Sequence, residues 1–152
     1  MAEYTAADVA MMQRAIACGR QCTSVERAYN VGAVIASGAG AVLSSGYSRQ
    51  LPGNTHAEQC ALEALPAGAA AAGLEDATMY TTMEPCSTRL SGNTPCVQRI
   101  LDAGIRRVCY GVREPPTFVD CRGVQLLAAA GVRVVHVAEA EADCRKLNAH
   151  IG

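Results

Sequence analysis

The sequence lacks a long apolar run, although half of its 152 residues are hydrophobic. No continuous stretch approaches the ~18 apolar residues that a membrane-spanning helix needs. The first residues, Met1–Thr5, also lack the basic and apolar pattern of an export or organelle-targeting leader. We therefore expect a soluble cytoplasmic protein without a membrane partner.

An excess of charge of one sign is absent as well. The formal net charge is −1, and no segment is a dense run of Lys and Arg. Proteins that bind duplexes or tRNA usually present such a basic surface. We therefore expect a small-molecule substrate and no nucleic-acid partner.

Cysteine, in contrast, is plentiful, with eight residues in the chain. Without an export signal, reduced thiols are a better expectation than a disulfide framework. Most of these side chains are expected to be small, buried apolar fillers. The eight positions are Cys18, Cys22, Cys60, Cys86, Cys96, Cys109, Cys121 and Cys144.

Capping residues, turn residues and apolar spacing divide the chain into alternating elements. No repeat or linker separates them, so we expect residues 1–152 to form one α/β domain. Strands and helices alternate after residue 77, which predicts parallel strands joined by right-handed crossovers. Residues 67–73 receive no firm structure. The expected helices cover 5–19, 55–65, 95–104, 123–130 and 138–150, and the expected strands cover 31–37, 41–46, 77–83, 106–112 and 132–137.

Local signals at the junctions make these elements more specific. Thr5 is the expected cap of the first helix, with Asp8 in its first turn. The link 37–40 predicts a hairpin at a sheet edge, whereas the β-branched and aromatic stretch 77–83 predicts a central strand. Pro95 is expected as the first residue of its helix, capped by Thr94 or Asn93.

Three residues form a pattern that is typical of a catalytic zinc site. His56, Cys86 and Cys96 supply one imidazole and two thiols, which hold zinc and leave a fourth position for water. His56 and Cys96 each stand at the expected start of a helix, where unpaired N–H groups favour anions such as thiolates. The pattern predicts Zn²⁺ as the cofactor.

Glu58 follows His56 by two residues and is not needed as a ligand. Water bound to zinc ionises near neutral pH, and the resulting hydroxide would attack an amino-bearing ring carbon. Glu58 would take the proton from the water, pass it to a ring nitrogen and finally protonate the departing ammonia. The sequence therefore predicts a zinc-dependent hydrolase of the deaminase kind with Glu58 as proton shuttle.

Simpler interpretations of the same residues remain open. Thr55 and Glu58 match a capping box, in which the carboxylate only bonds back to the Thr55 N–H. Cys60 lies one helical turn after His56 and is a rival ligand, although core packing explains it equally well.

The motifs resemble the cytidine deaminase-like superfamily. Nine residues separate the two cysteines, and this longer loop is similar to that of the deaminases of riboflavin biosynthesis. The resemblance spans residues 31–137. It rests on Gly46–Arg49, Leu51–Cys60, Thr82–Ser87, Arg89–Cys96, Gly111–Pro115 and Thr117–Phe118.

The resemblance implies a three-layer α/β/α fold with a mixed five-stranded sheet, and a homodimer. It also implies hydrolysis of the 2-amino group of 2,5-diamino-6-ribitylamino-4(3H)-pyrimidinone 5′-phosphate. The alternatives are a nucleoside, nucleotide or tRNA base deaminase on the same fold, or a non-catalytic zinc-binding domain. The near-neutral charge and the long loop argue against tRNA, and an intact Glu58 argues against a binding role alone.

Six further residues are expected to contact the substrate. Bacterial relatives carry Asn-Pro before the first strand, which this chain lacks, so Asn30 and Asn54 are candidates for the pyrimidine contact. Either is also a common turn former. Glu84 is expected to accept a hydrogen bond from an amino group or to brace its loop. The phosphate candidates, which are otherwise solvated surface, are Arg49, Arg89 and Arg122.

Overall fold

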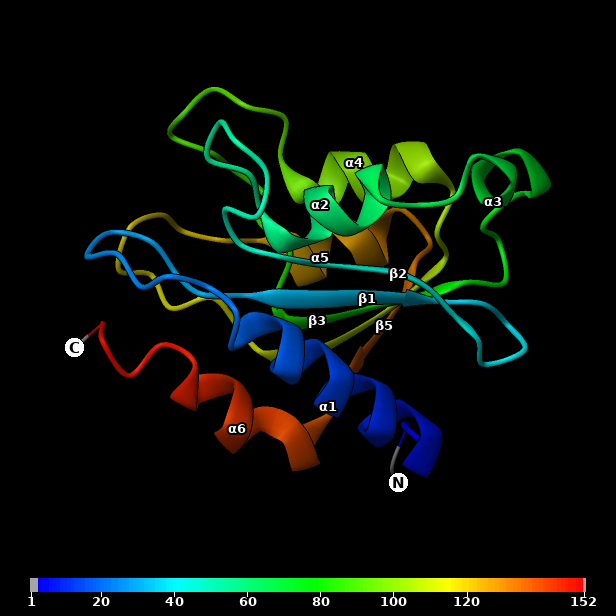
Figure 1. The fold of residues 1–152 in the computed structure, drawn as a ribbon, viewed down its shortest axis with the longest axis horizontal. Helices are drawn as coiled ribbons and strands as arrows, with labels where there is room; N and C mark the ends of the chain where they lie inside the picture. The colour runs from blue at the N-terminus through cyan, green and yellow to red at the C-terminus, as the bar shows by residue number, and fades with distance from the viewer. Residues whose placement is uncertain (1–2, 152) are drawn as a thin grey trace.

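The computed structural model of the protein describes residues 3–151. Its centre is a five-stranded sheet in the order β2-β1-β3-β4-β5 (Figure 1). β1 pairs antiparallel with β2 and β3, whereas β3, β4 and β5 are parallel. The predicted mixed sheet with a parallel second half is confirmed. The strands are β1 (Gly32–Ala36), β2 (Val42–Tyr47), β3 (Thr78–Met83), β4 (Arg107–Val112) and β5 (Arg133–His136).

Helices cover both faces of this sheet, which confirms the three-layer α/β/α arrangement (Figure 1). One face carries α1 (Ala6–Gly19) and α6 (Glu141–Lys146). The other face carries α2 (Ala57–Glu63), α4 (Cys96–Ala103) and α5 (Gly123–Ala129). A short helix, α3 (Ala67–Ala72), precedes β3, and a 3₁₀ turn, η1 (Ala138–Ala140), precedes α6.

Alternating side chains of the central strands fill a core on each side of the sheet. In β1, Val34 belongs to the core beneath α1, and Ile35 belongs to the core beneath α2 and α4. In β3, Tyr80 and Met79 divide in the same way. Every residue of β1 and β3 is buried, as expected for strands with helices on both faces. The prediction of 77–83 as a central strand is confirmed.

The junctions agree with the sequence signals in two places. Thr5 and Asp8 form a reciprocal capping box at the start of α1. The link 37–40 closes the hairpin through a hydrogen bond of 2.8 Å from the Ser37 N–H to the Ala41 carbonyl. Of the two hairpin strands, β2 lies at the sheet edge and β1 lies inside the sheet.

Two other predictions of local structure were wrong, and one stretch without a prediction forms a helix. Residues 67–72, which had no assigned structure, form α3. Pro95 has an extended backbone (ψ 149°) and occupies the N-cap position, so α4 begins at Cys96 without a side-chain cap. The closing helix expected over 138–150 is shorter, because η1 and α6 together end at Lys146.

The carboxyl ends of β3 and β4 lie side by side with the beginnings of α2 and α4, where open α/β sheets usually bind ligands. None of the helices within residues 3–151 has both the length and the apolarity needed to cross a bilayer.

Candidate active site

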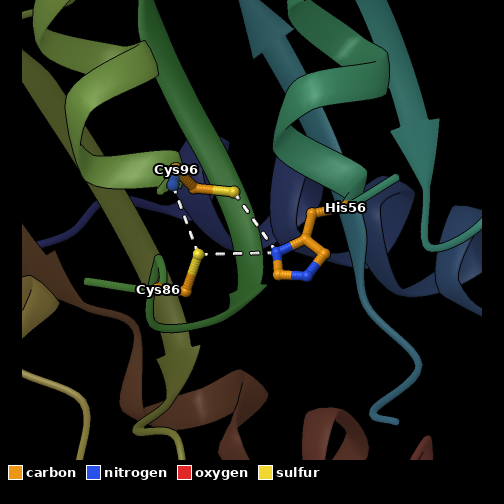
Figure 2. Close-up of side chains that lie close together, drawn as sticks. All are labelled: His56, Cys86 and Cys96. Atoms are coloured by element: carbon orange, nitrogen blue, oxygen red, sulfur yellow. Dashed lines mark hydrogen bonds between the residues drawn. The ribbon is translucent and has the colours of Figure 1, made fainter. Parts of the chain in front are cut away.

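Three side chains converge at the carboxyl end of β3. His56 precedes α2, Cys86 follows β3, and Cys96 is the first residue of α4 (Figure 2). The Nδ1 atom of His56 lies 3.5 Å from the Sγ atoms of both cysteines, and the three potential ligand atoms lie within 4.8 Å of one another. The fold thus brings together the three residues whose pattern predicted a metal site.

The chemistry and spacing of these atoms fit zinc. Both thiols are free, so no disulfide competes for them. Ligands at ~2.0–2.3 Å from a tetrahedral zinc lie roughly 3.5 Å from one another, which matches the distances from Nδ1 to sulfur. One imidazole and two thiolates leave a fourth position free, as in catalytic sites.

The surroundings of Cys86 favour its thiolate. The hydrogen bond from the Cys96 side chain holds the pKa of the Cys86 thiol below its ordinary value, and His56 adds to this effect. The first amide of α4, the Cys96 N–H, also donates to Cys86 Sγ over 3.2 Å. The same pairing, together with burial, raises the pKa of the Cys96 thiol. The pair therefore shares one proton, which metal binding would displace.

Glu58 lies in α2 and is only 3% exposed. Burial, and next the negative charge of Cys86, raise the pKa of Glu58 to about 8. The capping-box interpretation is wrong, because His56 is the N-cap residue of α2 and the Thr55 hydroxyl bonds the Leu51 backbone instead. The carboxyl group of Glu58 therefore does not serve as a cap of α2.

Cys60, the rival ligand, lies apart from the metal cluster. Its thiol is 2% exposed and donates to the Thr55 hydroxyl over 3.3 Å. It packs where α2 crosses Gly46, so closely that a Cβ on this glycine would lie 2.8 Å from the Cys60 Cβ. This arrangement supports its interpretation as core packing.

His56, Glu58 and Cys86 line a cavity of about 190 Å³. Four of the six predicted substrate contacts line the same cavity, namely Asn54, Glu84, Arg49 and Arg89. Asn30 and Arg122 do not belong to its lining. The remaining lining residues are Arg27, Ala28, Tyr29, Val31, Ser48, Met83, Thr88, Leu90, Ser91, Glu114, Phe118 and Val119.

Glu84 braces the loops around the cavity. Its two carboxylate oxygens accept hydrogen bonds of 3.0 Å from the N–H groups of Glu114 and Val124. Of the two roles expected for Glu84, the structure supports the bracing role. The start of α5 is also tightly packed here, because a Cβ on Gly123 would overlap the Pro85 carbonyl oxygen.

Asn30 and Arg49 bond to each other, and of the two only Arg49 lines the cavity. The Asn30 Nδ2 donates to Leu147, and its Oδ1 accepts 2.6 Å from the Arg49 guanidinium. Arg49 also donates to the carbonyls of Thr23 and Tyr29. Asn30 is 5% exposed, and its side chain forms hydrogen bonds within the protein.

Arg89 and Arg122 differ sharply in their surroundings. Arg89 is 9% exposed and donates to the carbonyls of Asn54 and Thr94 and to the Gln59 side chain. The Arg122 side chain is 71% exposed and pairs with Asp120 over 3.5 Å. Arg122 is therefore a solvated surface residue, which was the alternative to a phosphate contact.

Four residues with chemistry suited to a substrate line the cavity but had no role assigned from the sequence: Arg27, Tyr29, Glu114 and Phe118. Burial, followed by the charge of Cys86, raises the pKa of Glu114 to about 7. The Tyr29 and Phe118 rings are 5.3 Å apart between centroids, and Arg27 is exposed at the rim. Glu114 and Phe118 lie in motifs that the chain shares with the deaminases of riboflavin biosynthesis, and this similarity could have marked them as site residues. No feature of the sequence marked Tyr29 or Arg27.

The profile of the cytidine and deoxycytidylate deaminase zinc-binding region matches residues 5–112. The chain belongs to this deaminase family. Its membership, together with the His56, Cys86 and Cys96 cluster, identifies Zn²⁺ as the cofactor.

Curated relatives within the family come from riboflavin biosynthesis. The diaminohydroxyphosphoribosylamino-pyrimidine deaminase of Schizosaccharomyces pombe is 43% identical over 133 residues, covering 88% of this chain and 33% of that protein. The riboflavin biosynthesis protein RibD of Escherichia coli is 41% identical over 108 residues, covering 70% of this chain and 27% of that protein. This chain therefore spans about a third or less of these relatives.

Solved structures agree with this placement. The Rib2 deaminase of Aspergillus oryzae, a C-terminal deletion mutant in complex with DARIPP, is 29% identical with a TM-score of 0.78, covering 93% of this chain and 90% of that one. The dCMP deaminase of cyanophage S-TIM5 is 23% identical with a TM-score of 0.63, covering 86% of this chain and 96% of that one. The latter similarity concerns the fold alone.

Proposed function

We propose that this protein is a zinc-dependent hydrolase that removes the 2-amino group of 2,5-diamino-6-ribitylamino-4(3H)-pyrimidinone 5′-phosphate in riboflavin biosynthesis. The observation that carries the proposal is the cluster of His56, Cys86 and Cys96 near the buried carboxyl group of Glu58, with His56, Cys86 and Glu58 lining one cavity. A catalytic zinc site needs both an open coordination position and a proton carrier beside it. The named functions of the relatives supply the substrate class.

The ligands in the proposed site are His56 Nδ1 and the Sγ atoms of Cys86 and Cys96. Zinc bound there would act as a Lewis acid and lower the pKa of a coordinated water. Glu58 accepts a proton from the attacking water and donates it to a ring nitrogen of the pyrimidine. It then accepts the proton of the new hydroxyl group on the ring carbon and donates it to the amine, which leaves as ammonia. A pKa near neutrality suits a group that must both accept and donate.

The cavity also offers suitable contacts for an amino-rich pyrimidine. In the part of the chain that the structure describes, the Glu114 carboxyl group has no hydrogen-bond partner, so it is available to accept from an amino group of the substrate. Tyr29 and Phe118 supply aromatic surface for the ring. Arg27 and Arg49 line the same cavity and are proposed to bind the phosphate.

Assembly and location are also proposed. The resemblance supports a homodimer, which light scattering after size-exclusion chromatography would test. The eight free cysteines support a reducing compartment such as the cytoplasm.

Ammonia release from a panel of compounds tests the proposed reaction. The panel contains the diaminopyrimidine phosphate in its ribityl and ribosyl forms, cytidine, deoxycytidylate and a tRNA adenosine substrate. We expect activity on the ribityl compound in the zinc-loaded protein. Activity confined to cytidine, deoxycytidylate or tRNA would favour the other deaminase functions, and zinc binding without any ammonia release would leave a binding domain.

A further inference from the structure

The most unusual charged group near the site is Arg89, a buried cation with no acidic partner. Its side chain is nine-tenths buried, and no carboxylate lies within ion-pair distance of it among residues 3–151. Its Nε atom is enclosed by protein and has no hydrogen-bond partner at all. Burying an unpaired charge is costly, so its position requires a compensating role.

Arg89 bonds to the loops that carry the metal ligands. One Nη donates 2.6 Å to the carbonyl of Asn54, two residues before His56. The other donates 3.2 Å to the carbonyl of Thr94, two residues before Cys96, and 3.3 Å to the side chain of Gln59. Arg89 itself follows Cys86 by three residues. A single guanidinium therefore joins the backbone segments of all three ligands.

The charge of Arg89 also suits this position. Two thiolates and the Glu58 carboxylate carry one more negative charge than a zinc ion balances, and Arg89 supplies one positive charge.

We infer that Arg89 is a positioning residue that holds the three ligand-bearing loops in zinc-binding geometry before the metal arrives. The inference rests on the proposed zinc site but not on the identity of the substrate. A lysine cannot replace this function fully, because one ammonium group lacks the planar fork that reaches separate carbonyls at the same time.

Zinc affinity, measured by competition with a chromogenic chelator, tests the inference. We expect Arg89→Gln to raise the Kd for Zn²⁺ by about 10- to 100-fold, the usual effect of losing a partner behind the metal ligands. Arg99→Gln is the matched control, because Arg99 donates 3.2 Å to the same Thr94 carbonyl from the partly exposed side of α4. Its Kd should stay within about twofold of the wild type.

A second variant and a second signal keep the test decisive if Arg89→Gln does not fold. Arg89→Lys should fold and still bind zinc several-fold more weakly than the wild type, and its Co²⁺ form should show altered thiolate-to-cobalt absorption. Wild-type zinc affinity in Arg89→Gln would overturn the inference. Wild-type affinity and absorption in Arg89→Lys would overturn the joining role, because charge alone would then suffice. Either result is independent of whether the diaminopyrimidine phosphate is the substrate.

Discussion

Glu58 is the residue on which the proposed proton transfers depend. Glu58→Gln keeps the size of the side chain and removes its ability to carry a proton. We expect ammonia release to fall by about 10²- to 10⁴-fold, because a positioned acid–base group commonly contributes that much. Zinc content should remain at the wild-type level, since Glu58 lies outside the ligand cluster. Near-wild-type ammonia release from the zinc-loaded variant would remove Glu58 from the mechanism.

Glu114 is the proposed acceptor for an amino group of the pyrimidine. Glu114→Gln replaces a charged acceptor by a neutral one, so we expect KM for the diaminopyrimidine phosphate to rise by about tenfold with a smaller change in kcat. Steady-state kinetics of ammonia release would measure both values. An unchanged KM would show that the substrate does not use this carboxylate.

At the residue scale, side-chain chemistry predicted the cluster of potential metal ligands better than it predicted the residues that line the cavity. Imidazole and thiol side chains have few partners that suit them as well as zinc, so the spacing of His56, Cys86 and Cys96 was informative. Asn30 and Arg122 are of types that bond equally well to backbone, water or surface carboxylates. Whether they face the cavity depends on long-range packing, such as the bond between Asn30 and the Leu147 carbonyl.

The start of α5 packs tightly against the loop that carries Cys86. The Pro85 carbonyl oxygen lies where a Cβ on Gly123 would be placed, so Gly123→Ala must displace the backbone beside Cys86. We expect the variant to lose about 1–3 kcal/mol of unfolding free energy, as in overpacked cores, and to bind zinc more weakly. Thermal or urea unfolding and zinc titration would measure these effects.

Gly68→Ala is the control for this experiment. A Cβ on Gly68 in α3 meets no atom within 4 Å, so the change should be neutral or stabilise the helix by about 0.5–1 kcal/mol. Equal stability and zinc affinity in the two variants would contradict the role of close packing at Gly123.

At the element scale, strongly patterned segments were predicted and weakly patterned ones were not. The all-buried stretch 78–83 and the box of Thr5 and Asp8 carry local signals that the fold preserves. The stretch 67–72 consists of Ala and Gly and has no periodic apolar face, so α3 left no such signal. Pro95 suits the first helical position, but its extended backbone follows from the loop that it ends.

At the scale of the whole molecule, an ion pair of Asp8 and Arg107 lies on the face of the sheet that carries α1, opposite the site. Their side chains meet at 2.8 Å and join α1 to β4, and the Tyr80 hydroxyl donates 2.7 Å to the same carboxylate. The hydrogen bonds from Arg107 hold the pKa of Asp8 well below its usual range. A lowered pKa contributes stability above the ordinary value of about 4, and this contribution is lost as the pH falls through the folded-state pKa.

Asp8→Asn should therefore reduce the unfolding free energy at pH 7 by about 2 kcal/mol, since it removes hydrogen bonds to a charged group. Its stability should also fall less steeply than that of the wild type below pH 4. Urea unfolding between pH 7 and pH 3 would measure both effects. Parallel loss of stability in the two proteins across this range would contradict the role of the pair.

At the scale of the whole chain, the fold was more predictable than the site. Alternating strands and helices after residue 77 permit few arrangements, because parallel neighbours need right-handed crossovers. The placement of β1 between β2 and β3 is less accessible to local patterns, since it depends on pairing between residues more than 40 positions apart, such as Val34 and Tyr80.

X-ray absorption fine structure at the zinc edge of the purified zinc-loaded protein is the most direct test of the metal site. The proposed site predicts two sulfur ligands at ~2.3 Å and two nitrogen or oxygen ligands at ~2.0–2.1 Å, one of them from an imidazole. A shell of three or four sulfurs, or one without sulfur, would contradict a centre built from His56, Cys86 and Cys96 with an open position beside Glu58.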